Sequence, residues 1–461
     1  MLDPDVLAQT LSVALRSGGD FAEVFAEDRA SSNVTFDDGR VEDLVSGRQR
    51  GAGVRVVRGE STGYAHTADL TAAGLRDAAS AAAAAARGSA DDTRVVQLER
   101  RAVDTPTIAQ PPDAVPKQAK VAVLERADAA ARARGSAVQQ VNASYADGRR
   151  RILVANSDGL LVEDEQVRTR LAVSCVAVGD TGRRTGTEAP GRTVGFELFD
   201  EVSPEDVATT AADRALTMLD ARPAPSGPMP VVLRRGAGGV LFHEACGHGL
   251  EADLVDRDAS VFRGRMGERV AAPGVTLVDD GAYPREWGTY AIDDEGAPAR
   301  RTTLIDDGQL TDYMYDWLRA RKEQRASTGN GRRESYQHLP LVRMTNTLLL
   351  AGDEDPDAII ADTARGLYCV ALGGGQVDPA SGDFVFGVTE AYLIEDGRIT
   401  APVRAAQLIG NGPDVLRRID AVGSDFDTWA GTCGKGQRVP VSSGQPTLRV
   451  AELTVGGTAH A

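Results

Sequence analysis

Two proline-rich segments divide this chain and limit how its secondary structure can be arranged. They are residues 105–116 (TPTIAQPPDAVP) and 221–228 (ARPAPSGP). Proline removes a backbone donor and fixes φ, so such stretches are typical of extended connectors. A chain of 461 residues also exceeds what one hydrophobic core usually organises. We therefore predict an N-terminal α+β domain over residues 1–104, a middle α+β region over 117–220 and a C-terminal β-rich domain over 229–461.

The part before the first connector is predicted to contain two helices around a set of short strands. Leu7, Leu11 and Leu15 recur at the spacing of one helical face, which predicts a helix over residues 5–15 that ends at Gly18-Gly19. A second helix is expected over about 70–87. The strands between them are predicted at 21–25, 33–36, 41–45, 53–57 and 64–67, with a hairpin turn at 38–39.

The middle region is expected to repeat this order loosely, and the C-terminal part to consist mostly of strands. The fold class is therefore α+β, with α+β layers followed by a β-rich domain that carries one functional helix near residue 243. The middle elements are a helix over 117–134, strands between 138 and 199 with a turn at 156–159, and a helix over 204–219. Turns in the C-terminal part are predicted at 306–308, 373–375 and 396–397.

Composition narrows the class of partner and the compartment. The net charge of −16, from 51 basic and 67 acidic residues, disfavours binding to a phosphate backbone, so we predict no nucleic-acid partner. The N-terminus has no signal-peptide pattern and the chain has no run of eighteen apolar residues, so no membrane partner is expected either. Four scattered cysteines do not make a disulfide framework. These features predict a cytoplasmic protein.

The strongest chemical signal is the segment His243-Glu-Ala-Cys-Gly-His248. It is one residue longer than the HExxH pattern of ordinary zinc peptidases. On an ideal helix, residues four apart differ by about 40° in direction and residues five apart by about 140°. Both histidines therefore cannot face one metal ion from a regular helix. We predict a π-like bulge or a helix end at Gly247, which glycine permits most readily.

These residue types fit hydrolytic zinc chemistry. Neutral imidazoles are good zinc ligands, and a carboxylate beside the first ligand, here Glu244, can accept a proton from a zinc-activated water. Glu251, one turn after His248, could orient an imidazole. A histidine pair is often structural, and spacing leaves the third ligand open between Cys246 and Cys433. Two further cysteines lie in apolar runs and are expected in the core: Cys175 and Cys369.

Several blocks after Pro228 resemble the TldD/PmbA family of zinc metallopeptidases. The motif from His243 to Glu251 carries the resemblance most clearly. The front half resembles the family in layout, with residues 38–43 (DGRVED) as its best local match. The other blocks are residues 295–301 (EGAPARR), 331–340 (GRRESYQHLP), 343–347 (RMTNT), 373–378 (GGGQVD), 432–435 (TCGK), 444–446 (GQP) and 453–458 (LTVGGT).

The resemblance implies a metal site and an activity. The family's HExxxH histidines and C-terminal cysteine correspond to His243, His248 and Cys433, which would bind zinc, with Glu244 as the general base. Such enzymes cleave unstructured peptides inside a closed dimer, either as homodimers or paired with a metal-free TldE/PmbA paralogue. Intact motif residues make this chain similar to the active, TldD-type subunit. The alternative is a non-catalytic zinc-binding or scaffold subunit of such a complex.

Four more residues in these blocks are candidates for substrate contacts. Arg332, Arg333 and Arg343 could hold a peptide carboxylate or tie loops together. His338 could stabilise an oxyanion opposite the metal. The sequence leaves both questions open.

Overall fold

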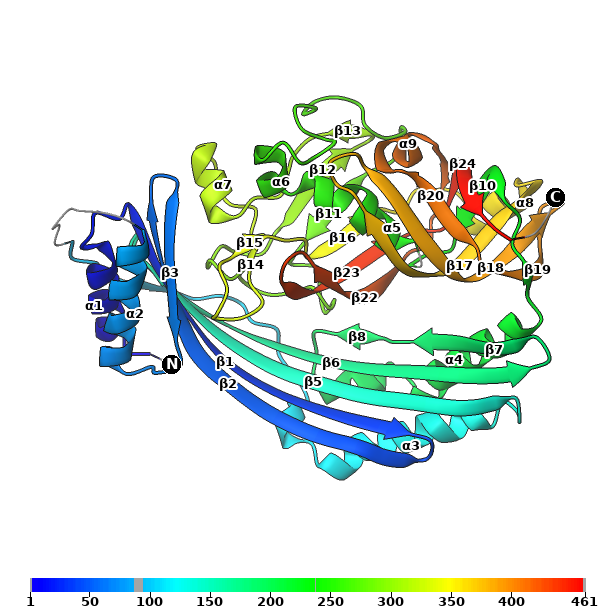
Figure 1. Cartoon of the computed structure of the whole chain (residues 1–461), viewed down its shortest axis with the longest axis horizontal. Coiled ribbons are helices and arrows are strands. Elements are labelled where there is room, and N and C mark those ends of the chain that lie inside the picture. The colour runs from blue at the N-terminus through cyan, green and yellow to red at the C-terminus, as the bar shows by residue number, and fades with distance from the viewer. Residues whose placement is uncertain (1, 87–93, 237, 459–461) are drawn as a thin grey trace.

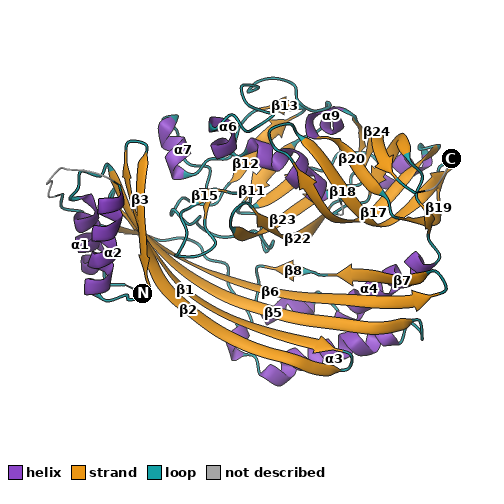
Figure 2. Cartoon of the chain, in the orientation of Figure 1, coloured by secondary structure: helices purple, strands orange, loops and turns teal. Residues whose placement is uncertain are grey.

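The computed structural model describes residues 2–86, 94–236 and 238–458. A long, curved β-sheet runs through the N-terminal half, with helices on its outer side and the C-terminal body on its inner side (Figure 1). Helices and strands alternate in the first half, whereas strands dominate the second (Figure 2). The α+β class predicted from the sequence is confirmed. Among the described residues, no helix is long and apolar enough to cross a membrane.

The first sheet combines strands from both sides of the first proline-rich connector. Its order is β3-β2-β1-β5-β6-β4, and β7 and β8 also pair with β6. Residues 1–104 and 117–220 therefore contribute to one sheet. The bounds are β1 Phe21–Asp37, β2 Arg40–Arg58, β3 Ser61–Thr67, β4 Glu99–Arg101, β5 Val138–Asn156, β6 Leu160–Gly179, β7 Gly182–Glu188 and β8 Gly191–Arg192.

The strands of this sheet are much longer than the short runs expected from sequence, so that part of the prediction was wrong. Strand β1 pairs along its whole length with β2 on one side and β5 on the other. Hydrogen bonds to two neighbours hold the polar stretch around Ser31 in the sheet although its side chains are partly exposed. The turn at Asp38-Gly39 is present, and Gly39 has the positive φ that it requires.

Two helical layers cover the outer side of the first sheet. Leu7 and Leu11 of α1 and Leu75 of α2 pack on Val54 in one core, and α3 and α4 pack with β5 and β6 in another. The expected helices are confirmed, although Arg87, the expected end of the second, lies outside the described residues. The expected strand region ending at 199 instead closes with a 3-10 turn at Phe196–Asp200. The bounds are α1 Pro4–Leu15, α2 Ala72–Ala85, α3 Lys117–Arg132 and α4 Pro204–Leu219.

The C-terminal body contains two further large sheets. The second sheet has the order β17-β10-β24-β20-β18-β19-β9, with β21 on β24, and the third has the order β13-β12-β11-β16-β23-β22. Their strands are β9 Arg222–Pro223, β10 Gly227–Leu233, β11 Leu277–Asp280, β12 Arg301–Asp306, β13 Gln309–Leu310, β16 Asn346–Leu349, β17 Arg365–Val377, β18 Asp383–Glu395, β19 Arg398–Arg404, β20 Gln407–Asn411, β21 Ile419–Val422, β22 Asp427–Gly434, β23 Arg438–Gln445 and β24 Leu448–Gly456. A small pair, β14 Gly331–Arg332 and β15 Leu341–Val342, lies beside them, with helices α5 Gly239–Phe242, α6 Ala252–Asp256, α7 Trp317–Lys322, α8 Pro356–Ala361 and α9 Gly412–Arg417.

One predicted turn, at residues 373–375, is wrong. These glycines lie inside β17, which pairs with β18 through several register shifts. A Cβ on Gly375 would lie 2.1 Å from Phe386 Cδ1, so glycine here allows a neighbouring aromatic ring to approach the backbone. The turns at 306–308 and 396–397 are confirmed, because each separates two antiparallel strands.

Buried ion pairs join the first sheet to the C-terminal body. Arg333 Nη2 lies 2.6 Å from Glu23 Oε1, and Arg55 bridges Glu23 at 2.9 Å and Glu295 at 2.7 Å. The rings of Phe21 and Trp317 stack beside them with centroids 3.8 Å apart. The C-terminal body is therefore attached to the inner side of the sheet at a defined position.

Candidate metal centre

The first two candidate ligands lie on a helix that changes its winding between them. Helix α5 leads into a π-helical turn over His243–Gly247, followed by a 3-10 turn over His248–Leu250. The predicted bulge is confirmed. Gly247 has an ordinary helical φ of −54°. A left-handed backbone conformation therefore does not explain why glycine occupies this position. A Cβ there would lie 2.2 Å from Met344 Sδ, so the close approach of Met344 requires glycine.

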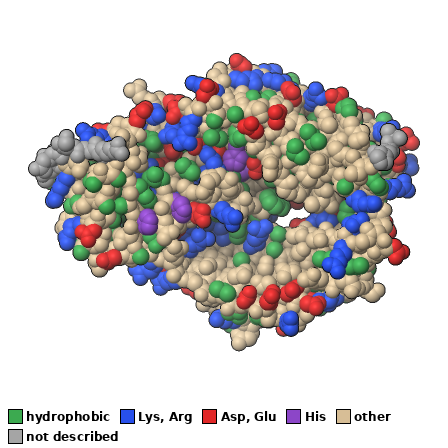
Figure 3. All heavy atoms as spheres, viewed as in Figure 1, with side chains coloured by type: hydrophobic (Ala, Val, Ile, Leu, Met, Phe, Trp, Pro, Cys, Tyr) green, Lys and Arg blue, Asp and Glu red, His purple; other side chains and the backbone are tan. Residues whose placement is uncertain are grey.

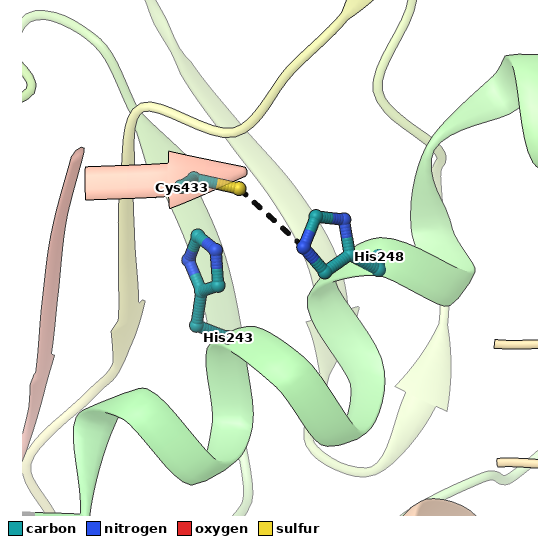
Figure 4. A group of neighbouring side chains, drawn as sticks. All are labelled: His243, His248 and Cys433. Atoms are coloured by element: carbon teal, nitrogen blue, oxygen red, sulfur yellow. Dashed lines mark hydrogen bonds between the residues drawn. The ribbon is translucent and has the colours of Figure 1, made fainter. Parts of the chain in front are cut away.

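The structure brings His243, His248 and Cys433 together. One ligand atom of each lies within 4.8 Å of the others, and all three side chains are buried. Cys433 Sγ is 3.4 Å from His248 Nε2 (Figure 4). The two imidazole rings are nearly perpendicular, at 84° with centroids 5.2 Å apart. Cys433 comes from strand β22, so two segments 185 residues apart in sequence meet at one point.

A buried carboxylate and a lysine lie behind His248. Glu251 Oε2 accepts a hydrogen bond of 2.8 Å from His248 Nδ1, which leaves Nε2 directed at the thiol. Lys435 Nζ lies 3.0 Å from Glu251 Oε2 and 2.6 Å from Asp253 Oδ1, and donates to Val342 O at 3.0 Å. Burial raises the pKa of Glu251, but His248 and Lys435 outweigh it and lower that pKa to about 2. Glu251 is thus ionised and fixes the tautomer of His248.

The electrostatics of the site favour an ionised Cys433. Burial raises the pKa of this thiol, but attraction to His243 and His248 outweighs it and lowers the pKa to about 4. His248 shows the reciprocal effect, because Glu251 and Cys433 raise its pKa well above the usual value against the effect of burial. A thiolate is the form of cysteine that binds metal.

Cys246, the competing cysteine, is directed elsewhere. Its Sγ donates a hydrogen bond of 2.9 Å to Phe242 O within the same helical segment. Burial raises the pKa of Cys246 to about 12, so the thiol stays protonated. Cys175 and Cys369 are buried in hydrophobic cores, as expected.

Glu244 lies next to the three candidate ligands without being part of the group. Its Oε2 is 3.6 Å from His248 Nε2, and its side chain is 25% exposed, compared with 9% for His248. A partly exposed carboxylate beside a closed group of ligands can reach a water molecule and exchange protons with solvent. The position therefore fits a general base.

The three residues fit a zinc ion by their chemistry, and one pair of donor atoms has the matching spacing. Tetrahedral zinc with nitrogen and thiolate ligands places neighbouring donor atoms about 3.3–3.7 Å apart, and the 3.4 Å between Cys433 Sγ and His248 Nε2 matches this. His243 is 3% exposed, yet neither of its ring nitrogens has a hydrogen-bond partner among the described residues. An unpartnered buried imidazole is costly unless it has a ligand. Three protein ligands leave a fourth tetrahedral position for water.

The arginine candidates are held by backbone and ion-pair contacts. Arg343 is fully buried and donates to Cys433 O at 2.8 Å and Gln437 O at 2.9 Å, so it fixes the end of β22 that carries the thiol and the turn after it. Arg332 donates to Met344 O and Pro440 O, and Arg333 pairs with Glu23.

The sequence-based candidates also included His338 and omitted Lys435. His338 Nδ1 lies 3.0 Å from Ser335 Oγ, outside the group of three ligands. The functional position missed from sequence is Lys435, whose one signal is its place two residues after the cysteine.

Comparisons with known proteins identify the family to which this candidate metal centre belongs. The model for the PmbA/TldA metallopeptidase C-terminal domain matches residues 226–457, the central domain 110–219 and domain 1 22–86. The chain is 40% identical over 450 residues to the "Metalloprotease TldD homolog" of Haemophilus influenzae, covering 95% of this chain and 93% of that protein. The chain belongs to the TldD/PmbA metallopeptidase family.

Two further similarities concern the metal and the fold. The chain is 32% identical to the "Zinc metalloprotease TldD homolog" of Saccharolobus solfataricus, over 56% of this chain and 58% of that protein. The crystal structure of TldE from Thermococcus kodakarensis superposes with a TM-score of 0.81 at 18% identity, covering 98% of this chain and 100% of that one. At 18% identity, the similarity to TldE shows a shared fold.

Proposed function

We propose that the chain is a zinc-dependent peptidase that hydrolyses unfolded peptides, with His243, His248 and Cys433 as zinc ligands. The observation that carries the proposal is a buried cluster of two imidazoles and an acidic thiol. One of these imidazoles, His243, has no hydrogen-bond partner among the described residues. The printed name of the Saccharolobus relative includes zinc, and ligand chemistry agrees, because mixed imidazole and thiolate ligands suit zinc.

Each residue around the site has a distinct task in this proposal. Zinc, when bound, lowers the pKa of a coordinated water towards neutrality and polarises a carbonyl. Glu244 accepts the proton that this water loses and later gives it to the leaving amine. Glu251 holds the Nδ1–H of His248, so that Nε2 keeps its lone pair for the metal, and Lys435 holds Glu251 in place.

The substrate is proposed to bind as an added strand. Strand β22, which carries Cys433, ends the strand order of the third sheet in the described part of the chain. An extended peptide can pair with such an edge through main-chain hydrogen bonds, which requires an unfolded segment and no particular folded partner. We further propose that the working unit is a dimer, with a second copy or a TldE/PmbA-like paralogue. The TldE structure among the fold neighbours supports this pairing.

Metal analysis combined with a matched pair of substrates tests the proposal. The purified protein should contain about one zinc per chain, lose cleavage on chelation and regain it on zinc addition. A reduced, denatured protein should be cut while its native form survives. Ultracentrifugation should show a species larger than the 48.5 kDa chain. A bound zinc with four protein ligands and no cleavage of any peptide would favour a scaffold subunit instead.

A further inference from the structure

A cavity of about 470 Å³ lies between the first sheet and the C-terminal body. Its walls come from β1, β5 and β6 on one side, and from the Arg332–Glu334 segment and strands β22 and β23 on the other. Figure 3 shows a hollow between these two parts of the molecule, with basic side chains gathered inside it. The cavity is separate from the cluster of metal ligands but borders the strand that carries Cys433, because Thr432 lines it.

The lining of this cavity is strongly basic. Seven of its residues are arginines and three are carboxylates, although the whole chain carries a net charge of −16. Two of the carboxylates already have cationic partners: Asp147 pairs with Lys120, and Asp294 lies 2.8 Å from Arg150. Asp294 offsets one of the seven arginines, Arg150, but three acids cannot cancel the charge of the remaining arginines.

Four of the seven arginines have no carboxylate within ion-pair distance anywhere in the described ranges. Two of the four, Arg168 and Arg332, are 9% and 4% exposed. Arg29 and Arg438 are exposed at the cavity wall. The remaining three pair with acids: Arg149 with Asp113, Arg150 with Glu27 and Asp294, and Arg333 with Glu23.

Arg168 is the clearest case of a buried arginine without an ion-pair partner among the described residues. Its guanidinium donates to Trp287 O at 2.7 Å, Thr289 O at 2.9 Å and Gln166 Oε1 at 3.0 Å, all of which are neutral acceptors. Burial and the neighbouring Arg332 and Arg150 together lower the pKa of Arg168 to about 9, against the attraction of Asp164. Neutral acceptors satisfy hydrogen bonds but leave a buried charge without a counter-ion, which is costly.

We infer that this cavity is an anion-binding site, which binds the carboxylates of an acidic peptide substrate. Arginine is suited to the task because its planar fork binds carboxylates with two parallel hydrogen bonds. Val439 and Pro440 of β23 line the cavity beside Thr432, and Cys433 pairs with Val439 across the two strands. A peptide that is cut at the metal could thus place acidic residues beyond the cleavage point among these arginines. That the bound peptide is a substrate rests on the proposed peptidase function. That the cavity binds an anion does not.

Binding of two matched peptides tests this inference directly. One peptide carries several glutamates, the other carries glutamine at the same positions, and both are fluorescently labelled. Anisotropy is measured at low and high salt on the Glu244→Ala protein, so that cleavage does not interfere. We expect the acidic peptide to bind about tenfold more tightly at low salt, with the preference shrinking as salt rises. The double variant Arg29→Gln/Arg438→Gln should lose the preference.

The choice of variants separates binding from folding. Arg29 and Arg438 are exposed, so their replacement leaves the buried ties of Arg168 intact. Arg398 on β19 is exposed and outside the cavity, so Arg398→Gln removes the same charge as a control and should keep the preference. Arg168→Gln should weaken binding further, and circular dichroism reports whether that variant folds.

The binding results then decide whether the cavity selects acidic peptides or another anion. Equal affinity for both peptides overturns the inference, even if the zinc enzyme cleaves both. If inorganic phosphate binds tightly while the two peptides bind equally, the cavity is a phosphate site. The assignment to an acidic peptide is then overturned as well. A preference for the acidic peptide that disappears in the double variant supports the inference. If, in addition, no peptide is ever cleaved, only the peptidase proposal is refuted.

Discussion

Lys435 Nζ lies 3.0 Å from Glu251 Oε2, the same oxygen that contacts His248. Glu251 in turn accepts the hydrogen bond of His248 Nδ1. The end of β22 and the turn that follows it therefore contribute twice, because β22 carries Cys433 and the turn carries Lys435, the cation that stabilises the carboxylate bonded to His248. A chain of lysine, glutamate and histidine of this kind orients an imidazole and raises its basicity.

Lys435→Met should weaken zinc binding by about 10–100-fold, because Glu251 loses the cation that keeps it ionised and in place. Glu251 is fully buried, so stability should fall as well, by about 1–3 kcal/mol. Competition with a chelating dye measures the affinity, and urea unfolding measures the stability. Lys322→Met is the matched control, since Lys322 pairs with Asp256 at the surface. Unchanged zinc affinity in Lys435→Met would show that Lys435 is merely structural.

Glu244→Ala should keep the zinc content and the fold but lower peptide cleavage by at least about a hundredfold, since only the proton acceptor is removed. Its side chain is 25% exposed and its contact with His248 is long, at 3.6 Å, so its loss should cost little stability. A fluorogenic peptide and metal analysis of the same sample give both readings. Glu99→Ala, an exposed glutamate on β4, serves as control. Normal turnover in a zinc-replete Glu244→Ala protein would require another base.

Glu295 should make stability depend on pH near neutrality. Burial, together with Asp316 and Glu23, raises the pKa of Glu295 to about 7 against the attraction of Arg55. A carboxyl group with a raised folded pKa stabilises the protein below its unfolded pKa of about 4.5, and this contribution is lost as pH rises towards 7. Glu295→Gln, which stays neutral, should therefore gain stability relative to the natural chain between pH 5 and pH 8.

Denaturant unfolding of both proteins at several pH values checks this prediction. The quantity to compare is the difference in unfolding free energy between Glu295→Gln and the natural chain. A difference that is constant across the range would contradict the raised pKa. Glu42→Gln, at an exposed position of β2, controls for the general loss of one carboxylate.

The sequence predicted local features of the fold and site well and tertiary ones poorly. The winding between His243 and His248 followed from spacing alone, because two ligands five residues apart cannot share a face of a regular helix. Spacing left Cys433 and Cys246 open as the third ligand, and the family resemblance favoured Cys433, because distance along the chain says nothing about position in space.

Other features were invisible because they depend on pairing between distant segments. The polar stretch around Ser31 lacks a strand pattern and is held by β2 and β5 on either side. Gly373–Gly375 looked like a turn because glycine is common there, but Phe386 across the strand pair is what requires it. The basic cavity combines residues from β1, β6 and β23 that no local pattern connects.

Cys433→Ala and Cys246→Ala should separate the two cysteines that sequence spacing left open. Cys433 Sγ lies 3.4 Å from His248 Nε2, whereas Cys246 Sγ donates to Phe242 O within its own helical segment. Their acidities also differ in direction, with the pKa of Cys433 lowered to about 4 and that of Cys246 raised to about 12. Cys433→Ala should therefore lose zinc and cleavage together. Cys246→Ala should keep both and lose about 1 kcal/mol of stability to a small cavity. Metal analysis of the two purified variants decides the question, because zinc kept by Cys433→Ala and lost by Cys246→Ala would reverse the assignment.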